Sequence, residues 1–114
     1  MKEKVIRVYV AGPYSNGDVA LNVREAITVG NELYDNGFIP FIPHFTHFWH
    51  MIFPRPYESW LAYDDEWLVC CDCVLRLPGF SNGADKEVDH ARQIGLPIYD
   101  SIGALLVAYG RHLS

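Results

Sequence analysis

Two kinds of apolar pattern alternate along the chain. Short runs rich in Val, Ile, Leu and Phe predict buried β-strands, and longer segments with apolar residues every three or four positions predict amphipathic helices. The predicted strands cover residues 4–12, 38–42, 73–78 and 96–100. The predicted helices cover 22–37, 58–72, a segment that ends at Gly95, and a stretch within 102–112. This alternation predicts an α/β fold with a parallel sheet covered by helices on both faces.

The order of the strands follows from the handedness of crossover connections. Right-handed crossovers favour a doubly wound, Rossmann-like sheet of about four strands with the flavodoxin-like order 2-1-3-4. Pro40 lies in the second strand and cannot donate to a ladder, which favours an edge position for that strand. The 114 residues are predicted to form a single domain, 1–114.

Two helical segments carry specific expectations about the core. Gly37 ends the first helix, whose apolar stripe consists of Val23, Ala26, Ile27, Leu33 and Tyr34. In 58–72, Asp64 shares one face with Leu68 and with two tryptophans that are predicted to face the core, Trp60 and Trp67. An acid among core tryptophans is not explained as part of a solvated face. Asp64 is therefore a candidate functional carboxylate.

In a doubly wound sheet, ligands bind beyond the carboxyl ends of the strands, where the strand order reverses. The reversal here lies between the first and third strands, so the loop after Gly12 meets the stretch "PGFSNGADKEVDH", residues 78–90. Ser81 suits a helix cap, and Asn82 and Gly83 suit an anion site at a helix N-terminus. An ordinary capped helix start is the competing interpretation.

Charged and phenolic residues near this reversal have two interpretations each. Glu87, about one turn into the helix, is either a catalytic carboxylate or one of several solvated charges. Tyr9 either packs in the core or reaches the cleft and hydrogen-bonds a carboxylate. Arg76, in the third strand, is expected to pair internally with an acid.

The segment 43–57 contains aromatics, prolines and histidines without a regular period, which predicts a long functional loop over the site. The spacing of His44, His47 and His50 resembles that of metal ligands, but Pro43 and Pro54 interrupt the helix that such ligands use. No metal site is therefore predicted. The expected role is stacking on and hydrogen-bonding to a planar ligand, with His44, His47 and Trp49 as substrate-binding residues.

Composition limits the partners. The net charge of −5 and the lack of a Lys/Arg cluster argue against binding to nucleic acid or anionic membranes. No apolar run approaches the roughly 20 residues of a membrane span, and the beginning of the sequence does not resemble a signal peptide, so a cytoplasmic protein is expected. The cysteines, Cys70, Cys71 and Cys73, are predicted to be buried and reduced.

Three stretches, in this order and spacing, resemble the nucleoside 2-deoxyribosyltransferase superfamily: "VYVAGPYS", "YDDEWLVCCDCVLRLPG" and "SNGADKEVDHARQIGLPI". The superfamily includes nucleoside transferases, (deoxy)nucleoside 5′-monophosphate N-glycosidases and short uncharacterised members, and this chain looks most like the short members. The similarity covers roughly residues 5–100. It implies a catalytic set of Tyr9, Asp64 and Glu87, and it places Gly12 in a substrate-binding loop.

The resemblance implies a double displacement, in which Glu87 attacks C1′ of the sugar and Tyr9 holds Glu87 in place. Asp64 either helps to protonate the departing base or orients the nucleophile. At Ser81 the nucleoside transferases usually carry an acid, whereas the monophosphate glycosidases resemble this chain in having serine, which favours a phosphorylated substrate. The residues that suit completion of the anion site are Asn16, Gly17, Asn22 and Arg24.

The expected function is therefore cleavage of the N-glycosidic bond of a nucleoside or 2′-deoxynucleoside 5′-monophosphate, with release of free base and without a cofactor. One alternative is a nucleoside 2′-deoxyribosyltransferase that exchanges bases, and another is a catalytically silent nucleotide-binding sensor. The resemblance also implies a homodimer or higher homo-oligomer, in which a neighbour's C-terminal segment, "IGALLVAYGRHL", closes the site.

Overall fold

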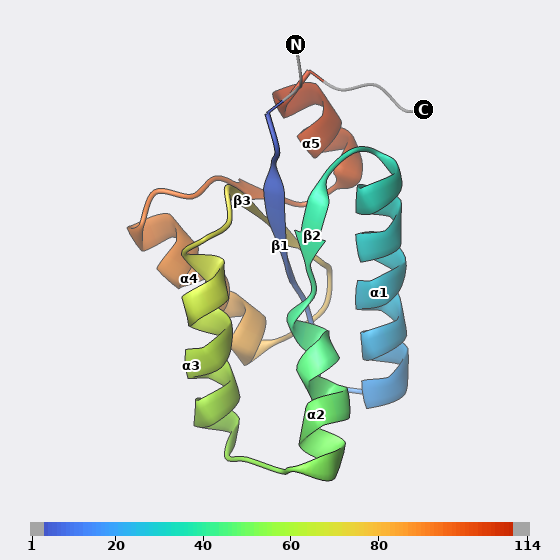
Figure 1. Ribbon diagram of the computed structural model, residues 1–114, viewed down its shortest axis with the longest axis vertical. Helices are drawn as coiled ribbons and strands as arrows, with labels where there is room; N and C mark the ends of the chain where they lie inside the picture. The colour runs from blue at the N-terminus through green and yellow to red at the C-terminus, as the bar shows by residue number, and fades with distance from the viewer. Residues whose placement is uncertain (1–3, 111–114) are drawn as a thin grey trace.

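The computed structural model describes residues 4–110, which contain an all-parallel sheet with helices on both faces (Figure 1). The strands are β1 (Arg7–Ala11), β2 (Ile39–Phe41), β3 (Cys73–Arg76) and β4 (Ile98–Tyr99). Their order is β2-β1-β3-β4, which confirms the predicted fold class and strand order. β2 lies at the edge of the sheet, as Pro40 predicts.

The predicted helices correspond to α1 (Val19–Asp35), α3 (Tyr57–Leu68), α4 (Asn82–Gln93) and α5 (Ile102–Ala108). The side chains of Asp18, Ser81 and Ser101 cap α1, α4 and α5, each accepting a backbone N–H bond of 3.0 Å. These caps explain why each of the three helices begins where it does.

The segment 43–57 differs from its prediction as a long loop. It contains a 3₁₀ turn, η1 (Pro43–Phe45), and a short helix, α2 (Thr46–Ile52). Proline at the first position of η1 suits the start of a helical turn, because the missing N–H would be unpaired there. No residue of α2 is buried, so its sequence carries no apolar stripe that a periodicity argument can detect.

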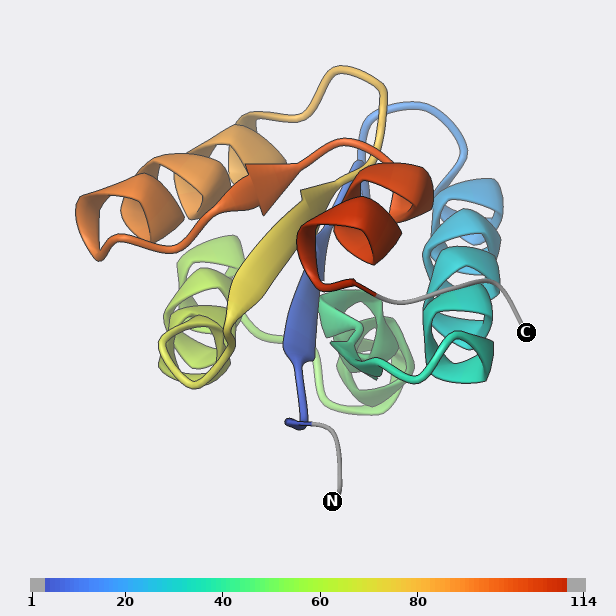
Figure 2. The ribbon, with the colours of Figure 1, turned by 90° about the horizontal axis from the view of Figure 1, so that it is seen from above.

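The central strand β1 buries its two faces against different helices (Figure 2). Val8 and Val10 pack in a cluster with residues of α1 and α5. Tyr9 and Ala11 point to the opposite face and pack in a cluster with residues of α3 and α4. This separation follows from the period of two along a strand, which sends successive side chains to opposite faces.

Two aromatic residues predicted to face the core lie outside it. Tyr34 is 65% exposed, because its neighbour Leu33 occupies the inward position of α1. Trp67 is 46% exposed and stacks on Phe41 of the edge strand, with the ring centroids 5.7 Å apart. Asp64, by contrast, is buried, as its position on α3 predicts.

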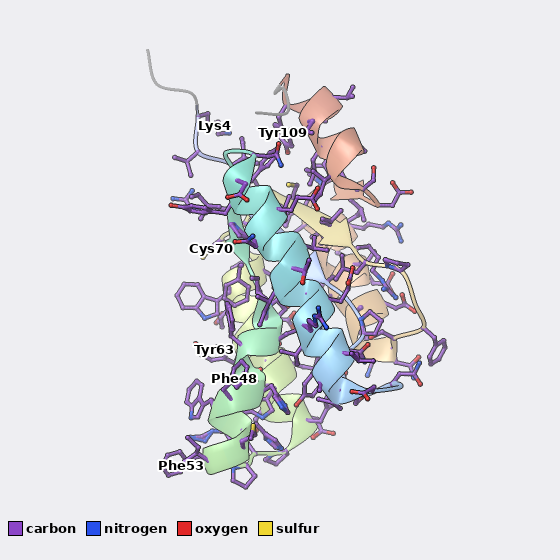
Figure 3. The ribbon with its side chains drawn as sticks, turned by 90° about the vertical axis from the view of Figure 1, so that its right-hand side faces the viewer. Lys4, Phe48, Phe53, Tyr63, Cys70 and Tyr109 are labelled. Atoms are coloured by element: carbon purple, nitrogen blue, oxygen red, sulfur yellow. The ribbon has the colours of Figure 1, made fainter. Side chains whose placement is uncertain are left out.

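The surface around α2 is rich in apolar side chains that remain in contact with solvent, namely Phe45, Phe48, Met51, Ile52 and Phe53. Figure 3 shows Phe48 and Phe53 on the same side of the molecule as Tyr63 and Cys70. Cys70 is exposed, contrary to its prediction, because it follows the last turn of α3, whereas Cys71 and Cys73 are buried and all three are free. Within residues 4–110, no helix has the length and apolarity needed to cross a membrane.

Candidate active site

A cleft opens where β1 and β3 end. Ala11 pairs with Arg76 at the last position of their register, and beyond it the chain diverges into the loops 12–18 and 77–81. The cleft has a volume of about 650 Å³. It lies at the reversal of strand order, where the topology predicts a ligand site. The predicted residues that line it are Gly12, Asn16, His44, Asp64, Ser81, Asn82, Gly83 and Glu87.

Glu87 lies one turn into α4 and is buried, with 7% of its surface exposed. The Tyr9 hydroxyl donates a hydrogen bond to Glu87 Oε2. Because Tyr9 is fully buried in β1, this bond ties the carboxylate to the rigid centre of the sheet. Both interpretations of Tyr9 therefore hold, because its ring packs in the core and its hydroxyl reaches a carboxylate.

Burial raises the pKa of Glu87 from 4.5 to about 7. The Tyr9 hydrogen bond opposes that increase, because it stabilises the ionised form. The charge of Asp65 raises the pKa of Glu87 further, and the guanidinium of Arg76 lowers it. The result is a carboxylate that ionises close to neutral pH while shielded from water.

Asp64 faces the cleft from α3 and is also 7% exposed. Its Oδ1 atom is buried and has no hydrogen-bond partner among the described residues. Burial, followed by the charges of Glu87 and Asp65, raises the pKa of Asp64 from 3.8 to about 8. Burial raises the pKa of both acids, and the charge of Glu87 raises that of Asp64 further, so the cleft disfavours ionisation of both acids at once.

The start of α4 forms the wall beside Glu87. Ser81 is buried, and its Oγ accepts a bond of 3.0 Å from Ala84 N, so Ser81 caps α4 as its position predicts. The hydroxyl proton of Ser81 remains available to a ligand, since the cap uses Oγ as an acceptor. A side chain at Gly83 would collide with the hydroxyl of Tyr57, the first residue of α3. Gly83 therefore permits close contact between the starts of α3 and α4.

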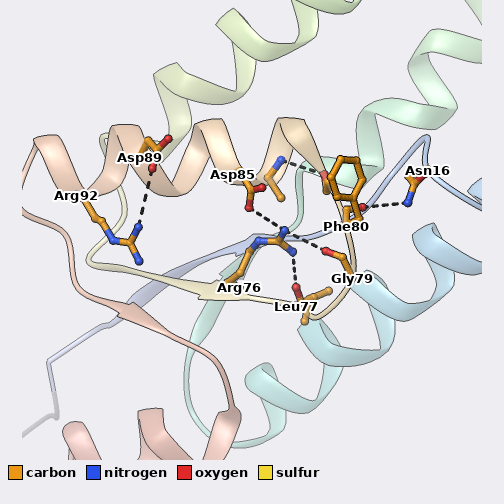
Figure 4. Close-up of polar contacts among 10 residues, drawn as sticks. Asn16, Arg76, Leu77, Gly79, Phe80, Asp85, Asp89 and Arg92 are labelled. Atoms are coloured by element: carbon orange, nitrogen blue, oxygen red, sulfur yellow. Dashed lines mark hydrogen bonds and ion pairs between the residues drawn. The ribbon is translucent and has the colours of Figure 1, made fainter.

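The loop 77–81 is fixed by side-chain bonds to its carbonyl groups (Figure 4). Arg76 donates to the carbonyls of Leu77 and Gly79, the latter at 3.1 Å, and pairs with Asp85 at 3.0 Å, which confirms the expected internal ion pair. On the other side, Asn16 Nδ2 donates to the Phe80 carbonyl at 3.2 Å. These bonds hold the mouth of the cleft in one arrangement.

The three histidines of segment 43–57 each have a different hydrogen-bond partner. His44 is buried, lines the cleft and donates from Nε2 to the Pro13 carbonyl at 2.9 Å. Burial lowers the pKa of His44, so its ring is neutral and its buried Nδ1 atom is an acceptor without a partner among the described residues. His47 Nδ1 hydrogen-bonds the Tyr14 hydroxyl at 2.6 Å, and His50 Nδ1 accepts from Trp60 Nε1 at 2.9 Å.

This arrangement does not bring every predicted binding residue to the cleft. His47 and Trp49 are not among the lining residues. Trp49 packs edge-on against Trp60 at 4.9 Å and thereby supports a residue that does line the cleft. Thr46 and His50 are the α2 residues that line the cleft, and their spacing of four places them on one face of the helix. His47 instead hydrogen-bonds Tyr14. Across residues 4–110, no three His, Cys, Asp or Glu side chains are grouped in a way that could hold a metal ion.

Arg55 and Tyr57 are among the lining residues that were not singled out in the sequence. Arg55 precedes α3, and Tyr57 begins it. Arg55 is the one lysine or arginine in 43–57 and lies between Pro54 and Pro56, a signal that charge counting within the segment could have found. The contact of Tyr57 with Gly83 joins two segments that are distant in the sequence, so the local pattern of residues does not predict it.

The fold and the cleft together define an α/β protein with a doubly wound parallel sheet and two buried carboxylates at its topological switch point. Residues 6–101 match the family described as a domain of unknown function (DUF7768), and the chain belongs to that family. No curated protein matches the sequence.

Proposed function

We propose that the protein cleaves the N-glycosidic bond of a nucleoside or 2′-deoxynucleoside 5′-monophosphate through a glycosyl intermediate on Glu87. One observation carries the proposal: a buried carboxylate held by a tyrosine shares a cleft with a second buried carboxylate whose Oδ1 has no partner. The resemblance of the three sequence stretches to the nucleoside 2-deoxyribosyltransferase superfamily supports the same chemistry. It assigns the roles of Tyr9, Asp64 and Glu87.

The protonation states support these roles. In the first step, the ionised Glu87 carboxylate forms a bond to C1′ while the bond from C1′ to the base nitrogen breaks. The electron pair of the broken bond stays on the base, which takes the proton of Asp64. In the second step, water gives a proton to Asp64 and its oxygen bonds C1′, which releases Glu87. Both acids then return to their starting states.

The required state, with Glu87 ionised and Asp64 protonated, defines a pH range. The pKa of Glu87 is about 7 and that of Asp64 about 8. The rate should therefore fall as pH drops below about 7, because Glu87 takes up a proton, and fall again above about 8, because Asp64 loses one. A bell-shaped profile of kcat/KM with these two limbs is the expected signature.

The first experiment is incubation with ribo- and 2′-deoxyribonucleosides and their 5′-monophosphates, with and without a second free base. Chromatography then measures released and exchanged base. Release from monophosphates without exchange supports the proposal. Exchange into a second base identifies a transferase instead. Tight nucleotide binding without release of base identifies the sensor.

Substitution of Ser81 tests whether the α4 start receives a phosphate. Aspartate caps helices about as well as serine, so Ser81→Asp should keep α4 intact while its charge repels a phosphate. We expect kcat/KM for monophosphates to fall by roughly 10-fold or more relative to nucleosides. Ser101→Asp is the matched control, because Ser101 caps α5 with the same 3.0 Å bond and does not line the cleft. An unchanged ratio in Ser81→Asp removes Ser81 from the phosphate site.

The homo-oligomer remains a prediction, which light scattering after size-exclusion chromatography can measure. The predicted closing segment belongs mainly to α5, and its last residues, from 111 onward, lie outside the described part of the chain.

A further inference from the structure

The side chain of Arg55 is held by aromatic rings at the rim of the cleft. Its guanidinium carbon lies 5.2 Å from the centre of the Trp49 ring and 5.7 Å from that of Trp60. Its backbone N–H donates to His50 Nδ1 at 3.2 Å, the same atom that accepts from Trp60 Nε1. Contacts therefore engage both the backbone and the side chain of Arg55, which is exposed at the rim of the cleft.

The guanidinium donors themselves remain unused by the protein. Within residues 4–110, no hydrogen bond or ion pair engages them, and neither Asp64 nor Glu87 pairs with Arg55. Arg76, the other arginine near the cleft, is committed to two carbonyls and to Asp85. A guanidinium whose position is fixed by stacking, with its planar donors free, suits bidentate binding of an oxyanion.

Charge limits what Arg55 can bind. The chain carries a net charge of −5, and the cleft contains two carboxylates. Among the described residues that line the cleft, Arg55 is the one lysine or arginine. A dianionic phosphate entering this cleft needs a compensating cation, and Arg55 is the cation that the walls provide. Arg24, suggested by the sequence, is exposed and does not line the cleft.

The position of Arg55 also matches the anion site at α4. Tyr57, two residues after Arg55, places its hydroxyl against Gly83 in the first turn of α4. The unpaired N–H groups of that turn and the Arg55 donors thus border the same opening. Glu87 and Asp64 lie one or two turns further along their helices, where the sugar carbon would react.

We propose that Arg55 binds the phosphate of the ligand, together with the start of α4, and makes the site selective for 5′-monophosphates over nucleosides. This inference rests on the proposed function for the identity of the ligand. It differs from the sequence-based expectation, because the cation comes from the segment before α3 and not from the loop or helix after β1.

The test measures binding apart from turnover, in a Glu87→Gln background that prevents consumption of the ligand. Isothermal titration gives the Kd of each 2′-deoxynucleoside 5′-monophosphate and of its parent nucleoside, with Arg55, Arg55→Lys or Arg55→Met. We expect Arg55→Met to weaken binding of monophosphates by roughly 10- to 100-fold and to leave nucleosides nearly unchanged. Arg55→Lys should recover part of the loss, because it keeps the charge without the planar fork. Arg24→Met is the matched control and should change neither Kd.

Tryptophan emission provides a second readout, since the guanidinium lies over Trp49 and Trp60. A monophosphate should change the emission more than its nucleoside does, and Arg55→Met should abolish that difference. The inference is overturned if the ratio of the nucleoside Kd to the monophosphate Kd is the same in Arg55→Met and in the parent. It is also overturned if Arg55→Met changes base preference alone, or if monophosphates do not bind at all. Arg55-dependent binding without base release by the wild type overturns the proposed function and leaves this inference standing. Base release that does not depend on Arg55 overturns this inference and leaves the proposed function standing.

Discussion

The two faces of the sheet use the same strands for different purposes. Between β1 and the pair α1 and α5, the buried side chains are almost wholly apolar, with Val8, Val10 and Leu75 at the centre. Between β1 and the pair α3 and α4, a core of similar kind contains Tyr9 and borders Asp64 and Glu87. One face is arranged for stability, and the other accepts the cost of buried acids in order to control their protonation.

The effect of these buried acids on the free energy of unfolding depends on pH. Folding raises the pKa of both acids, so the folded state binds more protons than the unfolded state between their ordinary and raised values. Stability should therefore fall as pH rises from about 4 to about 8. The apolar face contributes no such dependence.

The largest expected effect is loss of activity on substitution of Glu87. Glu87→Gln keeps the shape and an acceptor for the Tyr9 hydroxyl but removes the proposed nucleophile, so base release should fall by more than roughly 10³-fold. Denaturant titration at pH 8 should show stability equal to or above that of the wild type, because a buried charge has been removed. Glu66→Gln, at an exposed position of α3, is the control and should change neither quantity. A Glu87→Gln variant that keeps most of its activity, or that is less stable than the wild type at pH 8, would contradict the division between the faces.

Much of this division follows from particular sequence patterns. The run that contains Val8, Tyr9 and Val10 predicts a central buried strand, and alternation then places Tyr9 opposite its two neighbours. Asp64 could be selected from its acidic neighbours because helical spacing puts it beside Leu68. The strand order needed only the alternation of elements and the handedness rule.

The rest of the site depends on contacts that no local pattern records. α2 has no buried residue, so periodicity could not predict this helix or the directions in which His47 and Trp49 point. Arg55 acquires its position from tryptophans on two separate helices. Trp67 has the spacing of a core residue but stacks on Phe41 of the edge strand, and the pattern of one helix does not show where the sheet ends.

The next effect concerns the apolar face. Leu75 is 2% exposed and packs in the cluster with α1 and α5, so Leu75→Ala should lower the free energy of unfolding by about 2–5 kcal/mol. Urea titration measures that loss. The activity per folded molecule should stay near that of the wild type, because Leu75 points away from Tyr9 and the cleft. A fall in kcat larger than the fall in folded fraction would show that the two faces are coupled.

The smallest and most specific effect is expected from removal of the Tyr9 hydroxyl. Because its hydrogen bond favours the ionised form of Glu87, Tyr9→Phe should raise the pKa of Glu87 above its value of about 7. The acidic limb of the pH profile should then move upward by roughly one unit, and the rate at pH 7 should fall by roughly 3- to 10-fold. The loss should shrink as pH rises toward the limb set by Asp64, at about 8. Tyr99→Phe removes a hydroxyl from the face that packs on α5 and should leave both limbs in place. An acidic limb that stays at the same pH in Tyr9→Phe, with a uniformly lower rate, would mean that Tyr9 positions Glu87 without controlling its proton.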